Sequence, residues 1–171
     1  MTPIISTRFK RLALIALAAF AVVGVVAMDV GAKDRSPVID VSSDSAEMNA
    51  AIAKARATLP MFWTSYEAPK PSETGHMLKV RFPTRRNAGE HIWMAEVRKL
   101  GEGRYSGHFA NAPRDLPGRQ EGDLTEFKEA DISDWMFMRN GKIVGGETIR
   151  PLLKSLPKAD ADALRARLET P

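Results

Sequence analysis

The residues with the clearest capacity for chemistry are three histidines and a small group of aspartates. His76, His91 and His108 are the only histidines, and the chain has no cysteine. A tight metal site needs three or four converging ligands, and no two of these histidines have the short spacing that would bring them together. We therefore predict no metal site. The absence of cysteine also removes disulfides, thiolate ligands and thiol catalysis.

The aspartates offer general acid and base groups. Asp131 or Asp134 together with a histidine would suit a hydrolase. A simpler interpretation is structural, in which Asp131 caps a short turn and Asp123 belongs to a Gly-Asp turn. The chain has no Gly-x-Ser-x-Gly elbow, Walker loop or dinucleotide fingerprint. We predict no catalytic residue and no cofactor, and we keep the hydrolase as an alternative.

A glycine pair before a predicted helix start is the strongest candidate for a binding site. Backbone N–H groups at a helix N-terminus and a nearby arginine suit a carboxylate or phosphate. The alternative is structural: Arg150 forms a salt bridge with Asp134 or Glu147, and the tryptophans Trp63, Trp93 and Trp135 pack in the core. The candidate ligand-binding residues are Gly145, Gly146, Thr148, Arg150 and, if its ring is exposed, Trp135.

The elements that must position these residues follow from hydrophobic periodicity. Asp44 and Glu47 have capping-box spacing and predict a helix to about Thr58, with a further apolar turn to Tyr66. Alternating or apolar runs then predict strands at 78–82, 91–99, 105–110, 124–127, 135–138 and 143–144. The fold class is α+β: an N-terminal helix, a small antiparallel sheet of about six short strands or a half-open barrel, and one or two C-terminal helices.

Turns and helix starts complete this prediction. Residues 67–76 and 111–123 are predicted loops, and 131–134 a single helical turn. Asn140-Gly141 is a strong hairpin signal. Thr148 is predicted to cap a short helix to about Ser155, and Pro157 to begin a last helix.

The N-terminal segment has the pattern of a secretory signal. Arg8, Lys10 and Arg11 precede an uncharged, proline-free stretch from Leu12 to Met28. About 17 apolar residues is also the lower limit for crossing a bilayer, so an uncleaved anchor is the alternative. We expect 1–32 to be a signal peptide or membrane anchor, 33–44 a linker, and 45–171 a single α+β domain. The domain is expected in the periplasm or outside the cell, or anchored in the inner membrane facing the periplasm.

Charge restricts the class of partner. The chain carries 25 Lys+Arg and 21 Asp+Glu, a net charge of +4, and the N-terminal segment supplies half of that excess. The domain itself is too nearly neutral to predict nucleic-acid binding. The expected partner is a protein or a small anionic ligand, with membrane contact only through residues 12–28 if the segment stays uncleaved.

Three segments carry a resemblance to a known family. They contain His91-Ile92-Trp93, Ile132-Ser133-Asp134-Trp135-Met136, and Gly145-Gly146 followed by Thr148-Ile149-Arg150. In these runs the chain resembles the YegJ-like domain, a bacterial family of unknown function, over about residues 45–170. The resemblance implies the domain boundaries and no activity. The leading interpretation is a non-enzymatic binding or interaction module of the bacterial envelope; the alternatives are the hydrolase and a membrane-tethered structural protein.

Overall fold

The computed structural model describes residues 46–85 and 89–169. The predicted signal or anchor, the linker and the capping residue Asp44 lie outside these ranges. Among the described helices, none is long and apolar enough to cross a membrane.

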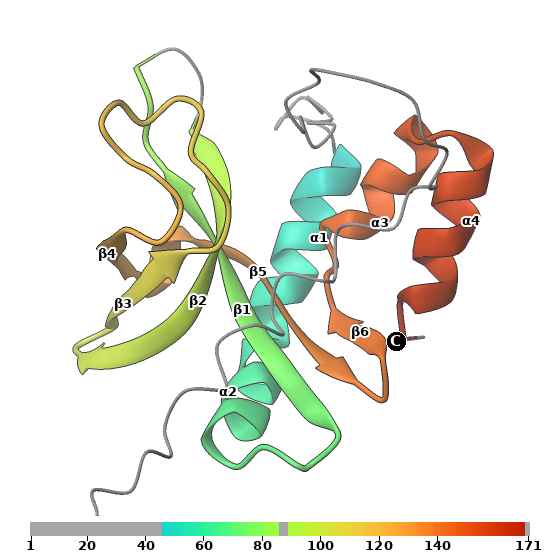
Figure 1. Ribbon diagram of the computed structural model, residues 1–171, viewed down its shortest axis with the longest axis horizontal. Coiled ribbons are helices and arrows are strands. Elements are labelled where there is room, and N and C mark those ends of the chain that lie inside the picture. Colours follow the sequence, from blue (N-terminus) through green and yellow to red (C-terminus); the bar gives the residue numbers. More distant parts are fainter. Residues whose placement is uncertain (1–45, 86–88, 170–171) are drawn as a thin grey trace, which may run out of the picture. The chain divides into compact units, whose positions relative to one another are not determined.

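The centre of the domain is one open antiparallel sheet with the strand order β4-β3-β2-β1-β5-β6 (Figure 1). The sheet and the segregated helices confirm the predicted α+β class. The strands are β1 (Glu73–Phe82), β2 (Glu90–Gly101), β3 (Arg104–Phe109), β4 (Leu124–Lys128), β5 (Ile132–Arg139) and β6 (Lys142–Gly145). The helices are α1 (Ala46–Ala57), α2 (Leu59–Glu67), α3 (Ile149–Leu152) and α4 (Lys158–Arg167), with 3-10 turns η1 (Glu129–Asp131) and η2 (Leu153–Ser155).

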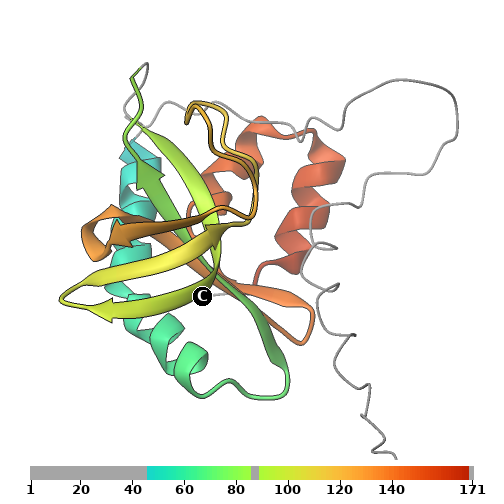
Figure 2. The ribbon, with the colours of Figure 1, turned by 60° about the vertical axis from the view of Figure 1, so that its left-hand side comes forward.

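Each face of the sheet is covered by a different set of helices. Side chains alternate along a strand, so β5 contributes Trp135 and Phe137 to one core cluster and Met136 and Met138 to the other. The first cluster packs under α1 and α2, and the second packs under α3, η2 and α4. The helices α3 and α4 lie at the β6 end of the sheet in both ribbon views (Figures 1 and 2).

Local sequence signals explain several junctions. Pro60 stands in the first turn of α2, where its missing N–H costs no helical hydrogen bond. Asn140 and Gly141 both have positive φ (50° and 77°), as a two-residue hairpin turn between β5 and β6 requires.

The two edges of the sheet differ. The β6 edge is covered by the C-terminal segment: Leu168 forms a parallel bridge with Ile143, and the Glu169 N–H donates to the Ile143 carbonyl at 2.8 Å. The opposite edge is β4, whose only strand neighbour in the described sheet is β3.

Three local predictions were wrong. The predicted loop 67–76 ends early, because β1 begins at Glu73. The predicted helical turn 131–134 lies earlier, at η1, and Ile132 to Asp134 belong to β5. The Thr148 side chain does not cap α3, because its hydroxyl donates a hydrogen bond to the Asp134 carboxylate.

Candidate functional site

The glycine pair forms a turn that only glycine fits. Gly145 and Gly146 have φ of 79° and 64°, a region that disfavours side chains. A Cβ on Gly145 would lie 2.4 Å from the Trp135 carbonyl oxygen. The tight turn brings the backbone N–H groups of Glu147 and Thr148 against β5.

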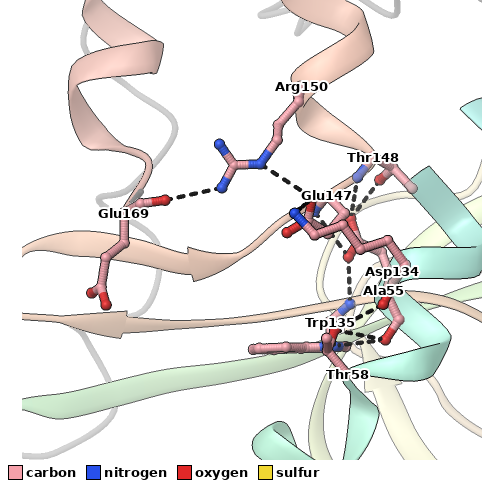
Figure 3. Close-up of polar contacts among 9 residues, drawn as sticks. Ala55, Thr58, Asp134, Trp135, Glu147, Thr148, Arg150 and Glu169 are labelled. Carbon is pink, nitrogen blue, oxygen red and sulfur yellow. Dashed lines mark hydrogen bonds and ion pairs between the residues drawn. The ribbon is translucent and has the colours of Figure 1, made fainter. Parts of the chain in front are cut away.

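The carboxylate of Asp134 occupies the place where an anion would bind at this turn (Figure 3). Its Oδ2 accepts hydrogen bonds from the Thr148 N–H (2.8 Å) and hydroxyl (2.6 Å). Its Oδ1 accepts from the Trp135 N–H (2.8 Å) and the Glu147 N–H (3.2 Å). Asp134 is fully buried. The turn therefore serves an internal carboxylate.

A buried polar chain continues from Asp134 to the next strand. Lys79 Nζ donates to Thr148 Oγ1 at 3.1 Å and lies 5.4 Å from the centre of the Trp93 ring. Burial lowers the pKa of Lys79, and the Asp134 charge opposes that shift. Burial likewise raises the pKa of Asp134, against the hydrogen bonds from Thr148. These groups link β1, β5 and α3 at the sheet face.

Arg150 makes internal contacts on the other side of the turn. Its Nε lies 3.3 Å from the Glu147 carboxylate, and its Nη2 donates to the Glu169 carbonyl at 3.0 Å (Figure 3). This confirms the Glu147 arm of the predicted salt bridge, whereas Asp134 is paired with Thr148 instead. Arg150 thereby ties α3 to the C-terminal segment.

The Trp135 ring is in the core, with 2% of the residue exposed. Its Nε1 donates to the Ala55 carbonyl at 2.9 Å. The tryptophan therefore anchors α1 to β5. Of the five predicted binding residues, four lie around one turn whose polar groups have internal partners, and a ligand role for them stays a prediction.

Neither aspartate proposed for a hydrolase is paired with a histidine in the described part of the chain, although His91 Nδ1 lies 2.8 Å from the hydroxyl of Ser133, the neighbour of Asp134. Asp131 accepts a hydrogen bond from the Lys128 N–H at 3.2 Å. Asp134 accepts hydrogen bonds from the glycine turn and from the Trp135 N–H. Within residues 46–85 and 89–169, no group of three or more potential metal ligands occurs.

One histidine does contact a serine and lies near a glutamate, a combination that the sequence did not suggest. Ser65 Oγ lies 2.8 Å from His76 Nε2 and donates to Glu73 Oε2 at 2.8 Å. The carboxylate thus binds the serine and not the far nitrogen of the imidazole, so the order of a catalytic triad is missing. Glu73 also pairs with Arg139 at 3.1 Å, and Ser65 is buried. The cluster holds α2 against β1.

A surface hollow at one end of the sheet is lined by residues 83–85, which follow β1, and by residues of the connection between β3 and β4. It comprises two adjoining open depressions of about 310 and 610 Å³. In the floor of the hollow the rings of Phe82 and Phe109 pack edge to face, with their ring centres 5.2 Å apart. The described lining residues are Phe82, Pro83, Thr84, Arg85, Phe109, Arg114, Asp115, Leu116, Pro117, Arg119 and Thr125.

The longer wall of this hollow is held in place by its backbone. Fourteen residues connect the end of β3 to the start of β4, and connections of this length without secondary structure are usually either functional or disordered. The Glu90 carboxylate accepts the Arg114 N–H (2.8 Å) and the Asp115 N–H (3.0 Å). The Gly122 N–H donates to the Phe109 carbonyl at 2.8 Å. The wall is therefore preorganised.

The hollow lies at a basic end of the sheet. Its lining holds three exposed arginines and one aspartate. The three arginine charges favour an anion in the hollow. On the opposite face of the sheet, burial, followed by the charges of Lys79, Arg81 and Arg56, lowers the pKa of His91 to about 4.

Sequence reasoning identified the loop 111–123 and missed the hollow. It treated the loop as turn-rich and did not single out Arg114 and Arg119. The available signal was a long loop in which arginines, prolines and a leucine are mixed. Phe82 and Phe109 gave no such signal, because their meeting depends on the sheet register.

Comparison with known proteins agrees with the resemblance seen in the sequence. A family model described as "Uncharacterized protein conserved in bacteria (DUF2314)" matches residues 45–167. The chain is also similar to "Uncharacterized protein YegJ" of Escherichia coli (strain K12), with 43% identity over 79 residues, 46% of this chain and 51% of that protein. The match thus spans about half the length of this curated relative. No solved structure matches.

Proposed function

We propose a binding function for this chain, which belongs to the bacterial family DUF2314. In our proposal it is an exported, non-enzymatic binding module of the bacterial envelope, and the hollow lined by residues 83–85 and by the β3–β4 connection is its binding site. The observation that carries the proposal is the combination of an apolar floor with a rim of three arginines.

The chemistry of the hollow specifies what it would take. The partly buried Phe82 and Leu116 offer apolar contact for a ring or branched side chain, with the buried Phe109 beneath them. Arg119 offers charge and forked hydrogen-bond donors for a carboxylate or phosphate, and Arg85 and Arg114 add positive charge. A ligand with an apolar body and a negative charge satisfies both parts.

Binding is tested with a matched pair of small probes, 4-phenylbutyrate and the uncharged 4-phenylbutanol, observed by ligand NMR. We expect the acid to bind and Arg119→Glu to weaken it about tenfold, because an attractive charge becomes repulsive. Lys142→Glu on the exposed β5–β6 hairpin is the control and should leave binding unchanged. Equal binding of both probes, or equal loss in both variants, contradicts the proposed site.

Export is supported by the cationic start and the apolar stretch Leu12–Met28. We expect the full chain, expressed in a bacterium, to yield a periplasmic product that begins near Met28 or Lys33. Intact-mass measurement of separated fractions tests this. An intact N-terminus in the membrane fraction supports the tethered alternative, and a product confined to the cytoplasm refutes export.

A further inference from the structure

Within residues 46–85 and 89–169 the β4 edge of the sheet pairs with no further strand, and it lies beside the proposed binding hollow. The strand β4 pairs with β3 through Tyr105↔Phe127 and Gly107↔Thr125, and the Glu129 N–H donates to the Gly103 carbonyl at 2.9 Å. In an antiparallel pair, alternate residues direct both backbone groups to the partner strand. The Glu129 N–H points to β3, so the residues two and four positions before it, Phe127 and Thr125, also direct their backbone N–H and C=O groups to β3.

The remaining residues of β4 turn their backbone groups to the open edge. These are Leu124, Glu126 and Lys128, and the Lys128 N–H is already bound to the Asp131 carboxylate. Leu124 is 56% exposed, which is high for a large apolar residue. Leu124 and Glu126 thus present both donors and acceptors to a further strand.

The hollow and the edge meet at Thr125. Its side chain lines the hollow together with Phe82 and Phe109, and its register places it on the same face of the sheet as the Phe127 side chain. A strand added outside β4 would direct every second side chain to that face. One of those side chains would reach the apolar floor.

We infer that the partner is an extended acidic peptide segment that adds to the sheet at β4 and inserts one large apolar side chain into the hollow. This inference rests on the proposed function, because it uses the same hollow. Charge complementarity selects the acidic partner: the rim carries Arg85, Arg114 and Arg119 against Asp115. Main-chain hydrogen bonds to the edge supply affinity, and the hollow supplies specificity.

The test uses a blocked heptapeptide with phenylalanine at its centre, glutamate two positions before and after it on the same face, and threonine at the other positions. Two further versions are N-methylated, one at the odd and one at the even amides. A peptide that pairs with β4 directs only one of these sets toward the protein. Calorimetry on the full chain should therefore show one methylated version weakened at least about tenfold and the other binding like the parent.

A protein variant tests the same edge independently. Glu126→Pro removes an outward N–H that the fold does not use, and proline is tolerated at such edge positions. It should weaken the peptide about tenfold, whereas Glu126→Ala should not weaken it, and 4-phenylbutyrate binding should stay unchanged in both. A melting curve for each variant checks folding, and the methylated peptides decide the matter if the proline variant unfolds.

The outcomes separate this inference from the proposed function. If both methylated peptides bind like the parent, or if 4-phenylbutyrate binds and the peptide does not, strand addition is wrong and the hollow remains a binding site. If neither the peptide nor 4-phenylbutyrate binds, the proposed function itself is wrong.

Discussion

Replacing Asp134 by alanine removes the group on which the glycine turn is built. The buried N–H groups of Trp135, Glu147 and Thr148 would lose their acceptor, at distances of 2.8, 3.2 and 2.8 Å. A stranded buried donor costs about 1–3 kcal/mol, so three of them predict a loss of about 6 kcal/mol in the free energy of unfolding. Asp134→Asn retains one acceptor oxygen and should lose about 2 kcal/mol.

Urea unfolding followed by tryptophan fluorescence measures both losses. The control is Asp131→Ala, which removes only the 3.2 Å hydrogen bond from the Lys128 N–H at an exposed turn and should cost under about 1 kcal/mol. Equal small losses for Asp134→Ala and Asp131→Ala would refute the account of Asp134 as the buried acceptor. A loss for Asp134→Asn as large as that for alanine would show that the charge, and not the number of acceptors, is decisive.

Three further changes test the packing and the electrostatics of the same region. Gly145→Ala should cost about 3 kcal/mol, because its Cβ would meet the Trp135 carbonyl oxygen at 2.4 Å, whereas Gly141→Ala, with open space and a similar φ, should cost about 1 kcal/mol in the same urea assay. Trp135→Ala should cost about 4 kcal/mol and the half-buried Trp93→Ala about 2 kcal/mol; equal losses would contradict the burial difference. The lowered pKa of His91, about 4, means that the unfolded chain binds the proton more tightly, so stability should fall by about 2 kcal/mol as the pH drops from about 6.5 to 4. His91→Gln should flatten that dependence in urea midpoints measured across this range.

The parts of the fold that depend only on residues adjacent in the sequence were predictable from the sequence. The Asn140-Gly141 hairpin follows from a backbone preference that needs no distant partner. By contrast, β1 begins at Glu73, in a segment with turn-like composition. Its first residues are stabilised by Arg139, 66 positions later in the chain, and no local pattern reveals such a partner.

The candidate site shows the same limit. The glycine pair was correctly identified as a turn that exposes backbone N–H groups, but its acceptor, Asp134, was assigned to a helical turn. That assignment hid the fact that β5 carries the carboxylate directly to those N–H groups. The hollow depends on two connections that are separate in sequence and adjacent only through the order of the strands.

The C-terminal segment covers one edge of the sheet and not the other, and this limits how copies of this domain can associate. A sheet that is open on both sides can add a new copy at either side without end, which is the geometry of a fibre. Here Leu168 and Glu169 pair with Ile143 on the β6 side, so among the described residues only the β4 edge is left for another strand. Pairing of copies through this edge alone would give a dimer related by a twofold axis and no longer assembly. By occupying the β6 edge at Ile143, the C-terminal segment blocks the second contact that a fibre needs, and its removal would expose that edge to another copy.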